Sequence, residues 1–266
     1  MKKRLDILLL ERGFFTSREK AKANIMAGNV LVDEIVEYKA GAMIDETKAH
    51  IEVRENLLPY VSRGGLKLEK AIKEFGISLK DKICLDIGAS TGGFTDCMMQ
   101  NGAKKVYSVD VGYGQLDYRL RTDERVVNIE RTNFRYMDNS LIKDRIDFAS
   151  IDVSFISLDK ILPKLRELLG DDFEVTALIK PQFEAGKEEV GKNGIIRDKN
   201  IHRNVIKNVI SFSLKNGFFP DKLSFSPVKG QKGNIEFLIH LSNQRNGLEE
   251  HTIDSVVEQA WLELNK

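Results

Sequence analysis

Cysteine is scarce in this chain of 266 residues, which contains only Cys84 and Cys97. The first lies in an apolar stretch and the second in an expected helix, and they do not form a Cys-x-x-Cys pair. This pattern excludes a disulfide framework and indicates no zinc site. We therefore expect no metal ligands and a reducing, cytoplasmic environment.

Long apolar runs are missing as well. The first residues, MKKRLDILLLERG, imitate a signal peptide with their basic start, but the apolar run is short and is flanked by Asp6 and Glu11. No stretch approaches the roughly 20 apolar residues that span a bilayer. We expect neither a targeting segment nor a membrane helix.

The chain also lacks an excess of charge of one sign. Its 41 Lys and Arg residues and 40 Asp and Glu residues give a net charge of +1, which by itself indicates no anionic partner. A hydrophobic content of 42% over this length can form the core of one large domain and a small one.

The small domain is expected at residues 1–54. Apolar residues recur at helical spacing from Leu5 to Arg12, and a second helix begins near Ser17 and ends at Gly28. The segments NVLVD and HIEV are short and alternating, as is typical of strands. We predict a small α+β unit.

Basic residues are concentrated at its start. The first 30 residues carry seven Lys or Arg against three Asp or Glu, which suits a helix lying on phosphates but also an ordinary solvated helix face. The run TSREKAKANIMAGNVLVD resembles the S4 RNA-binding domain over about residues 4–54. The resemblance implies binding to structured RNA, with candidate contacts at Arg4, Arg18, Lys20 and Lys22. Glu34 departs from the S4 pattern, in which glycine is common at this position. We therefore expect a different turn at this point.

ENLLPYVSRGG contains Pro59 and two glycines and predicts an interdomain linker at residues 55–63. Strand and helix patterns then alternate over residues 64–242, which predicts an α/β, Rossmann-like doubly wound sheet. The tail, residues 243–266, is expected to be helical, with Trp261 packing against the domain. Ligands of such sheets bind at the carboxyl ends of the strands.

A glycine-rich turn follows the first of these strands, KICLDIG. Its GxxxGG spacing is not that of a dinucleotide or P-loop motif, and its acid would repel a pyrophosphate but suit a ligand with an ammonium group. A second acid ends the next strand, where it can bind ribose hydroxyls. These features favour S-adenosylmethionine as the cofactor over a plain glycine turn. The candidate contacts are Asp86, Gly88, Ser90, Thr91, Gly92, Gly93, Phe94 and Asp110.

The motifs that the chain lacks limit the chemical class of the methyl acceptor. The chain lacks the Asn/Asp-Pro-Pro-Tyr tetrad of N-methylation, and neither cysteine is well placed as a nucleophile, so a hydroxyl remains. Removing the proton of the hydroxyl requires a base. A lysine can act as this base when its surroundings disfavour the charged form of its amino group. Each of four strand-end or loop residues alone suggests a surface charge or an ion pair, but their joint location suggests catalysis: Lys67, Asp152, Lys180 and Glu236.

The order of these four residues resembles the Lys-Asp-Lys-Glu tetrad of FtsJ-type ribose 2′-O-methyltransferases. Together with SRGGLKL, LDIGASTGGFTD, DVSFISL, LIKPQFEAG, GIIRD and SPVKGQKGNIEFL, it is similar to the TlyA family of hemolysin-A-like rRNA methyltransferases across almost the whole chain.

The resemblance implies 2′-O-methylation of cytidine in ribosomal RNA, with ribosomal subunits as partners. It also implies that Lys180 is the general base and that Lys67, Asp152 and Glu236 orient it and hold the target ribose. We expect Gly64 and Gly65 to turn the chain closely around the substrate and Arg63 to meet phosphate.

Two other functions stay open: a membrane-active hemolysin, and a non-catalytic protein that binds ribosomal RNA during assembly. The charged, glycine-rich segment 186–198 is expected either to cover the site or to be a plain surface loop.

Overall fold

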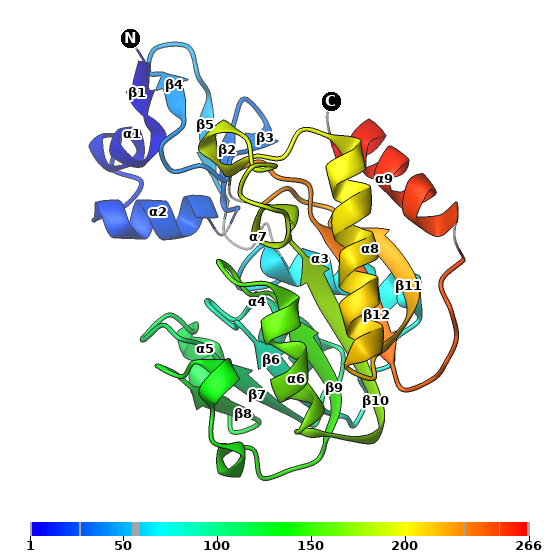
Figure 1. The fold of residues 1–266 in the computed structure, drawn as a ribbon. Helices are drawn as coiled ribbons and strands as arrows, with labels where there is room; N and C mark the ends of the chain where they lie inside the picture. The colour runs from blue at the N-terminus through cyan, green and yellow to red at the C-terminus, as the bar shows by residue number, and fades with distance from the viewer. Residues whose placement is uncertain (1, 27, 55–58, 231, 250, 265–266) are drawn as a thin grey trace. The chain divides into compact units, whose positions relative to one another are not determined.

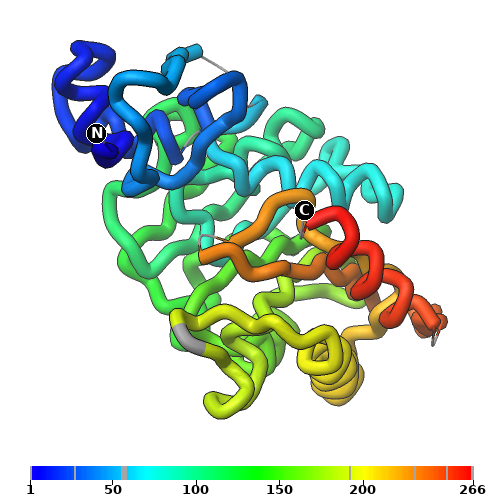
Figure 2. The backbone as a smooth tube through the Cα atoms, turned by 90° about the horizontal axis from the view of Figure 1, so that it is seen from above, coloured from blue at the N-terminus to red at the C-terminus, as the bar shows by residue number. Residues whose placement is uncertain are grey.

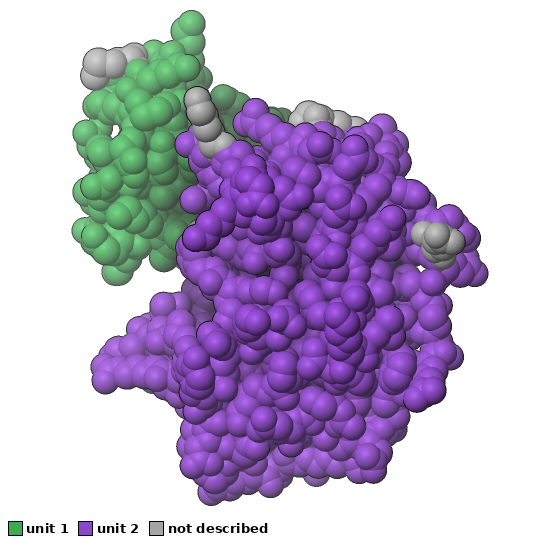
Figure 3. Space-filling model, in the orientation of Figure 1, with its two compact units in different colours: residues 1–65 green, residues 66–266 purple. Residues whose placement is uncertain are grey.

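The computed structural model describes residues 2–26, 28–54, 59–230, 232–249 and 251–264. The chain forms two compact units, residues 1–65 and 66–266 (Figure 3). Part of the predicted linker, residues 55–58, lies outside the described residues.

The first unit contains both predicted helices, α1 (Leu5–Glu11) and α2 (Arg18–Met26). Both predicted strands are present as neighbours in a three-stranded antiparallel sheet, order β3-β2-β5. The apolar positions of α1 and α2 pack on this sheet because their spacing puts them on one side of each helix. The strands of the unit are β1 (Lys2–Arg4), β2 (Val30–Val32), β3 (Ile35–Val36), β4 (Met43–Asp45) and β5 (Ile51–Val53), with β1 paired to β4.

The turn between β2 and β3 is where the sequence departs from the S4 pattern. Asp33 and Glu34 have φ of 50° and 68°, the left-handed conformation that two-residue hairpin turns require. Glycine adopts it without strain, whereas a glutamate at this position carries a conformational penalty.

The second unit is built on a seven-stranded sheet, order β11-β12-β10-β9-β6-β7-β8 (Figure 1). Strands β8, β7, β6, β9 and β10 are parallel neighbours, and β12 runs antiparallel between β10 and β11. This confirms the predicted Rossmann-like sheet. The strands are β6 (Ile83–Ile87), β7 (Lys105–Val109), β8 (Val126–Ile129), β9 (Ile146–Ile151), β10 (Leu169–Ile179), β11 (Phe219–Phe225) and β12 (Phe237–Ser242).

Helices cover both faces of the sheet. Helix α3 (Gly64–Phe75) lies on one face, and α6 (Leu162–Arg166) and α8 (Lys199–Lys215) lie on the other (Figures 1 and 2). The predicted tail helix is α9 (His251–Leu264), which packs on α8 and β11. The remaining helices are α4 (Gly93–Gln100), α5 (Tyr118–Arg121) and α7 (Pro181–Glu184), with 3-10 turns at Phe134–Tyr136, Asn139–Leu141, Leu158–Lys160 and Lys192–Gly194.

The core explains why the central strands read as continuous apolar runs. Phe148, Ala149 and Ile151 of β9 are fully buried, because helices cover the sheet on both sides. The parallel strands β6, β7, β9 and β10 end at one edge of the sheet, so the residues that follow them come together there.

Candidate active site

Four ionisable side chains from four different segments meet at this carboxyl edge. Lys67 comes from α3, Asp152 follows β9, Lys180 follows β10 and Glu236 precedes β12. The Nζ atom of Lys67 lies 2.8 Å from Oε2 of Glu236 and 3.5 Å from Oδ2 of Asp152. The Nζ atom of Lys180 lies 2.5 Å from Oδ1 of Asp152. The structure thus brings together all four residues singled out from the sequence.

The cluster is largely withdrawn from water. Lys67, Lys180 and Glu236 are 7%, 9% and 2% exposed, and two ammonium groups face two carboxylates. Burial alone would raise the pKa of Asp152, but the charges of Lys67 and Lys180 outweigh it and lower that pKa to about 2. Asp152 therefore stays ionised and fixes the position of both lysines.

The sequence indicated no role for Ser154 and Phe155, which lie close to Asp152 in the chain. The Nζ atom of Lys180 donates to Oγ of Ser154 at 3.0 Å. Phe155 is 86% exposed, has φ of 64° and lies 4.9 Å from the ring of Phe183. An exposed phenyl ring held in a left-handed backbone conformation is unusual, and such strain concentrates at functional sites. The signal in the sequence was DVSFISL itself, whose aromatic residue lies three positions after Asp152.

The glycine-rich turn between β6 and α4 approaches other backbone closely. Gly88 has φ of 88°, and a Cβ atom there would lie 2.5 Å from the backbone oxygen of Asp152. Gly92 has φ of 95°, and its Cβ atom would lie 2.4 Å from Cδ1 of Leu120. Any other residue at these positions would displace the turn, so both glycines are needed to form the cradle at the start of α4.

Asp110 ties this turn to the end of β7. Its Oδ2 accepts from the backbone N–H of Ser90 at 2.8 Å, and its Oδ1 accepts from that of Gly112 at 2.6 Å. The side chain is half-buried. Ser90 and Thr91 are exposed on the same turn. A half-buried carboxylate beside an exposed, glycine-lined turn fits the adenosine part of S-adenosylmethionine, whose ribose hydroxyls are donors.

The structure corrects the expected position of two cofactor candidates. Asp86 is fully buried and accepts hydrogen bonds from Oγ1 of Thr95 at 2.7 Å and Oγ of Ser150 at 3.1 Å, so its carboxylate does not face the loop surface. Burial raises the pKa of Asp86 to about 7, despite these hydrogen bonds. Phe94 is also in the interior, 4% exposed. Both side chains support the turn from within. The sequence pattern did not show which way the last residue of a strand points.

Gly64 and Gly65 differ from expectation as well. They are the first two residues of α3 and form no turn. A Cβ atom on Gly65 would lie 2.3 Å from Cγ of Tyr60, so the missing side chain is needed for close packing. Arg63 lies with its guanidinium 5.4 Å from the centre of the Tyr38 ring. The stretch SRGGLKL therefore begins a helix that carries Lys67 to the cluster.

The basic residues of the first unit fall into two groups. Arg4 and Arg18 both donate to the buried carboxylate of Asp6, at 3.0 and 2.9 Å. The hydrogen bond from Arg4, with that from Arg18, holds the pKa of Asp6 below its usual value. Lys20 is exposed and Lys22 is half-buried. The lysines thus lie on the surface of α2, whereas the arginines also stabilise the unit.

Neither a metal centre nor a membrane span was found in the described part of the chain. No group of His, Cys, Asp and Glu side chains among those residues could hold a metal ion. Within the same ranges, no helix combines the length and the apolar character needed to cross a bilayer.

Comparison with known proteins identifies the family. The FtsJ-like methyltransferase family matches residues 60–243, more than half of the chain. YqxC of Bacillus subtilis, a candidate rRNA methyltransferase, is 57% identical over 271 residues, which cover 100% of this chain and 96% of the relative. The 16S/23S rRNA (cytidine-2′-O)-methyltransferase TlyA of Mycobacterium tuberculosis is 39% identical over 241 residues, 91% of this chain and 90% of the relative.

A solved structure from Streptococcus thermophilus, described as a candidate hemolysin, is 48% identical and superposes with a TM-score of 0.79, covering 99% of this chain and 97% of that one. These matches extend over both units and include the four clustered residues. The chain therefore belongs to the TlyA, or hemolysin A, family of FtsJ-like, S-adenosylmethionine-dependent methyltransferases.

Proposed function

We propose that this protein transfers a methyl group from S-adenosylmethionine to the 2′-hydroxyl of a cytidine in ribosomal RNA, with Lys180 as the general base. The observation that carries the proposal is the buried cluster in which Asp152 holds the amino groups of Lys67 and Lys180 at one strand end. The substrate class is that of the relative from Mycobacterium tuberculosis, a 16S/23S rRNA (cytidine-2′-O)-methyltransferase.

The cofactor supplies an electrophilic methyl group on a sulfonium, which leaves as a neutral thioether. Gly88 to Gly93 and Asp110 would hold it, because the turn is open to close approach and the carboxylate can accept from ribose hydroxyls. Gly88 of the turn lies close to the backbone of Asp152, so the cofactor turn and the catalytic cluster have a fixed position relative to each other. Such alignment is the main source of acceleration in a displacement reaction.

Lys180 would take the proton from O2′ as the new O–C bond forms. To do so it must first release its own proton to solvent, and Asp152 and Ser154 fix the direction of the neutral amino group. Lys67 faces the carboxylates of Glu236 and Asp152, which favour its ammonium form, and it can stabilise the developing oxyanion of the ribose. The four residues then divide into one base, one electrostatic stabiliser and two orienting carboxylates.

RNA contacts are proposed for both units. Lys20 and Lys22 would meet phosphates from α2, while Arg4 and Arg18 would do so less strongly because they also serve Asp6. Arg63 is a further phosphate candidate. The exposed ring of Phe155 offers a surface on which an unstacked base can lie next to the reacting ribose.

The test is methyl transfer from labelled S-adenosylmethionine to ribosomal subunits that lack the modification, followed by mapping of alkali-resistant ribose positions. We expect label at one or two cytidine 2′-hydroxyls. Binding of the cofactor without label on either subunit would refute the reaction and favour a non-catalytic RNA-binding role. Leakage of liposomes at low concentrations of RNA-free protein would instead support a membrane-active one.

A further inference from the structure

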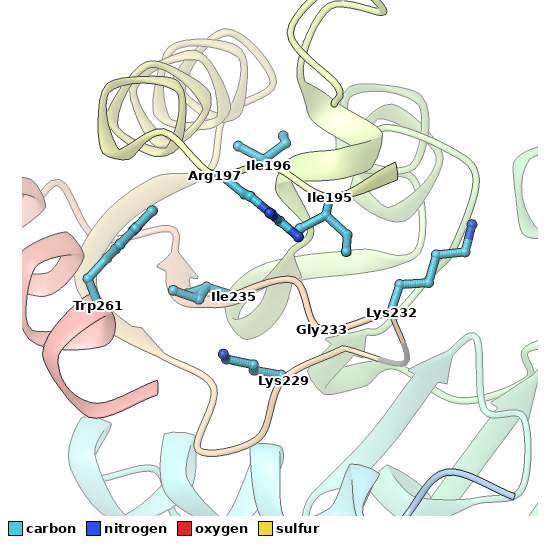
Figure 4. A pocket seen from close by; sticks show the side chains of 8 residues that line it. All are labelled: Ile195, Ile196, Arg197, Lys229, Lys232, Gly233, Ile235 and Trp261. Carbon is cyan, nitrogen blue, oxygen red and sulfur yellow. The ribbon is translucent and has the colours of Figure 1, made fainter. Parts of the chain in front are cut away.

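A cavity lies near the catalytic cluster and is not used by the proposed reaction. Its volume is about 390 Å³, within the range of small-ligand pockets. Two loops and the last helix line it (Figure 4). The lining residues are Ile195, Ile196, Arg197, Lys229, Lys232, Gly233, Ile235 and Trp261.

Asn234 fixes the two loops to each other. Its Oδ1 accepts from the backbone N–H of Ile196 at 3.0 Å, and its Nδ2 donates to the carbonyl of Gly194 at 2.8 Å. The side chain is 2% exposed. The GIIRD end of segment 186–198 is therefore bound to the loop that carries Glu236, just before β12, and this wall of the cavity is preformed.

The cavity is positively charged. Arg197, Lys229 and Lys232 are its only ionisable lining residues among those described, and none of the lining side chains is acidic. Within the described ranges, Arg197 and Lys232 have no carboxylate partner. In Figure 4 the Arg197 side chain extends between the two loops, with Lys229 below it. The amino end of Lys232 points away from both, on the far side of Ile195 (Figure 4). The excess of positive charge around this concave space attracts an anion such as a phosphate.

The rest of the lining is apolar and includes a flat aromatic ring. Ile196 and Ile235 are each 4% exposed and form the floor. Trp261 is half-buried and donates from Nε1 to Nδ1 of His202 at 3.0 Å, which fixes the plane of its indole. A phosphate alone needs no such surface, whereas a nucleotide does, because its base can stack on an indole. Trp261 thus packs, as the sequence indicated, and also borders a ligand-sized space.

One loop contributes residues both to the cavity and to the catalytic cluster. Ile235 in its lining precedes Glu236, which binds Lys67. The same loop folds back on Glu236, since a Cβ atom on Gly230 would lie 2.4 Å from Oε1 of that residue. A strand of RNA with its target ribose at Lys180 would therefore pass close to the cavity.

We propose that this cavity binds an unstacked nucleotide of the RNA substrate, flanking the methylated one. Arg197 meets its phosphate, Lys229 and Lys232 add positive charge on either side, and Trp261 with the isoleucines packs against its base. The inference rests on the proposed function, because it takes RNA as the substrate.

Trp261 is the only tryptophan of the chain, so its fluorescence reports on this cavity. The unaltered protein is titrated with a ten-nucleotide oligocytidylate, and tryptophan emission is compared with the anisotropy of a dye-labelled copy. We expect saturable quenching with the same midpoint as binding. Binding by anisotropy with no change in emission would overturn the proposal. Quenching by cytidine monophosphate or inorganic phosphate, but not by the oligomer, would also overturn it in favour of a small anionic ligand.

A charge-removal pair adds a second test. Arg197→Gln with Lys232→Gln is expected to weaken oligomer binding about tenfold and to reduce the slope of log affinity against log salt by roughly 0.7 for each phosphate that is no longer neutralised. The matched control is Lys207→Gln with Lys215→Gln, two exposed lysines of α8, which should leave affinity unchanged. Equal affinities for the two pairs would refute the site.

The two proposals fail separately. Quenching without any methylation of ribosomal RNA would refute the proposed reaction and leave the nucleotide cavity in place. Normal methylation together with unchanged tryptophan emission on RNA binding would refute only the proposal that the cavity binds a nucleotide.

Discussion

Replacing Asp152 by asparagine tests how the catalytic cluster is held together. The change keeps the size of the side chain but removes the charge that faces Lys67 at 3.5 Å and Lys180 at 2.5 Å. Lys67 would keep the carboxylate of Glu236, whereas Lys180 would lose the carboxylate that it faces. Removing one partner of a buried ion pair is costly because it leaves uncompensated charge in the interior.

The magnitude follows from the titration of Asp152. Its pKa falls from 3.8 to about 2 in the folded chain, which corresponds to roughly 2 kcal/mol of stabilisation. Because the folded pKa is the lower one, this contribution is present above about pH 4 and is lost as the pH falls toward 2. We expect Asp152→Asn to lower the free energy of unfolding at pH 7 by about 2–4 kcal/mol.

Activity should fall further than stability alone explains. With the lysines no longer oriented, methyl transfer should drop by about 10²–10⁴-fold, while cofactor affinity changes little. The assays are urea denaturation and single-turnover methyl transfer. The control is Asp159→Asn, which breaks the exposed pair with Lys160 and should cost at most about 1 kcal/mol. An Asp152→Asn protein that methylates within about threefold of the normal rate would refute the reasoning.

Three further predictions concern the frame around the site. Because the pKa of Asp86 is raised to about 7 in the folded chain, its protonated form favours folding, and stability should fall by up to about 4 kcal/mol as the pH rises from 4 to 7. Asp86→Asn should flatten that dependence in denaturation curves, and an unchanged curve would contradict this. Gly88→Ala should weaken cofactor binding at least tenfold in calorimetry, because its Cβ atom would lie 2.5 Å from the backbone oxygen of Asp152; normal affinity would show that the turn can shift freely. Glu34→Gly should stabilise the first unit by about 1 kcal/mol, because the φ of residue 34 is 68°. The control, Glu19→Gly within α2, should destabilise the unit by a similar amount. Equal melting temperatures for the two variants would contradict the proposed backbone strain at Glu34.

The sequence was a good guide to the elements and to the edge where the site lies. The alternation of strand and helix patterns predicted the doubly wound sheet of the larger unit, and apolar runs such as KICLDIG indicated its central strands because parallel strands are buried on both faces. The topology then places the residues after these strands together, which is why Lys180 and Asp152 could be paired without a structure. A strand of two residues, such as β3 (Ile35–Val36), has no period to detect.

Side-chain direction was the part that the sequence could not supply. Asp86 ends a strand next to the cofactor turn, yet its carboxylate points inward to Thr95 and Ser150. Gly64 and Gly65 read as a flexible turn but begin a helix, because Gly65 must pack closely on Tyr60. These outcomes depend on long-range contacts, which local residue patterns do not encode.

The most direct measurement of the central claim is the rate of methyl transfer by Lys180→Ala under single-turnover conditions with saturating S-adenosylmethionine and unmodified ribosomal subunits. The account predicts a fall of about 10²–10⁴-fold with cofactor affinity retained, because the group that accepts the O2′ proton is gone. A rate equal to that of the unaltered protein would contradict the assignment of Lys180 as the base.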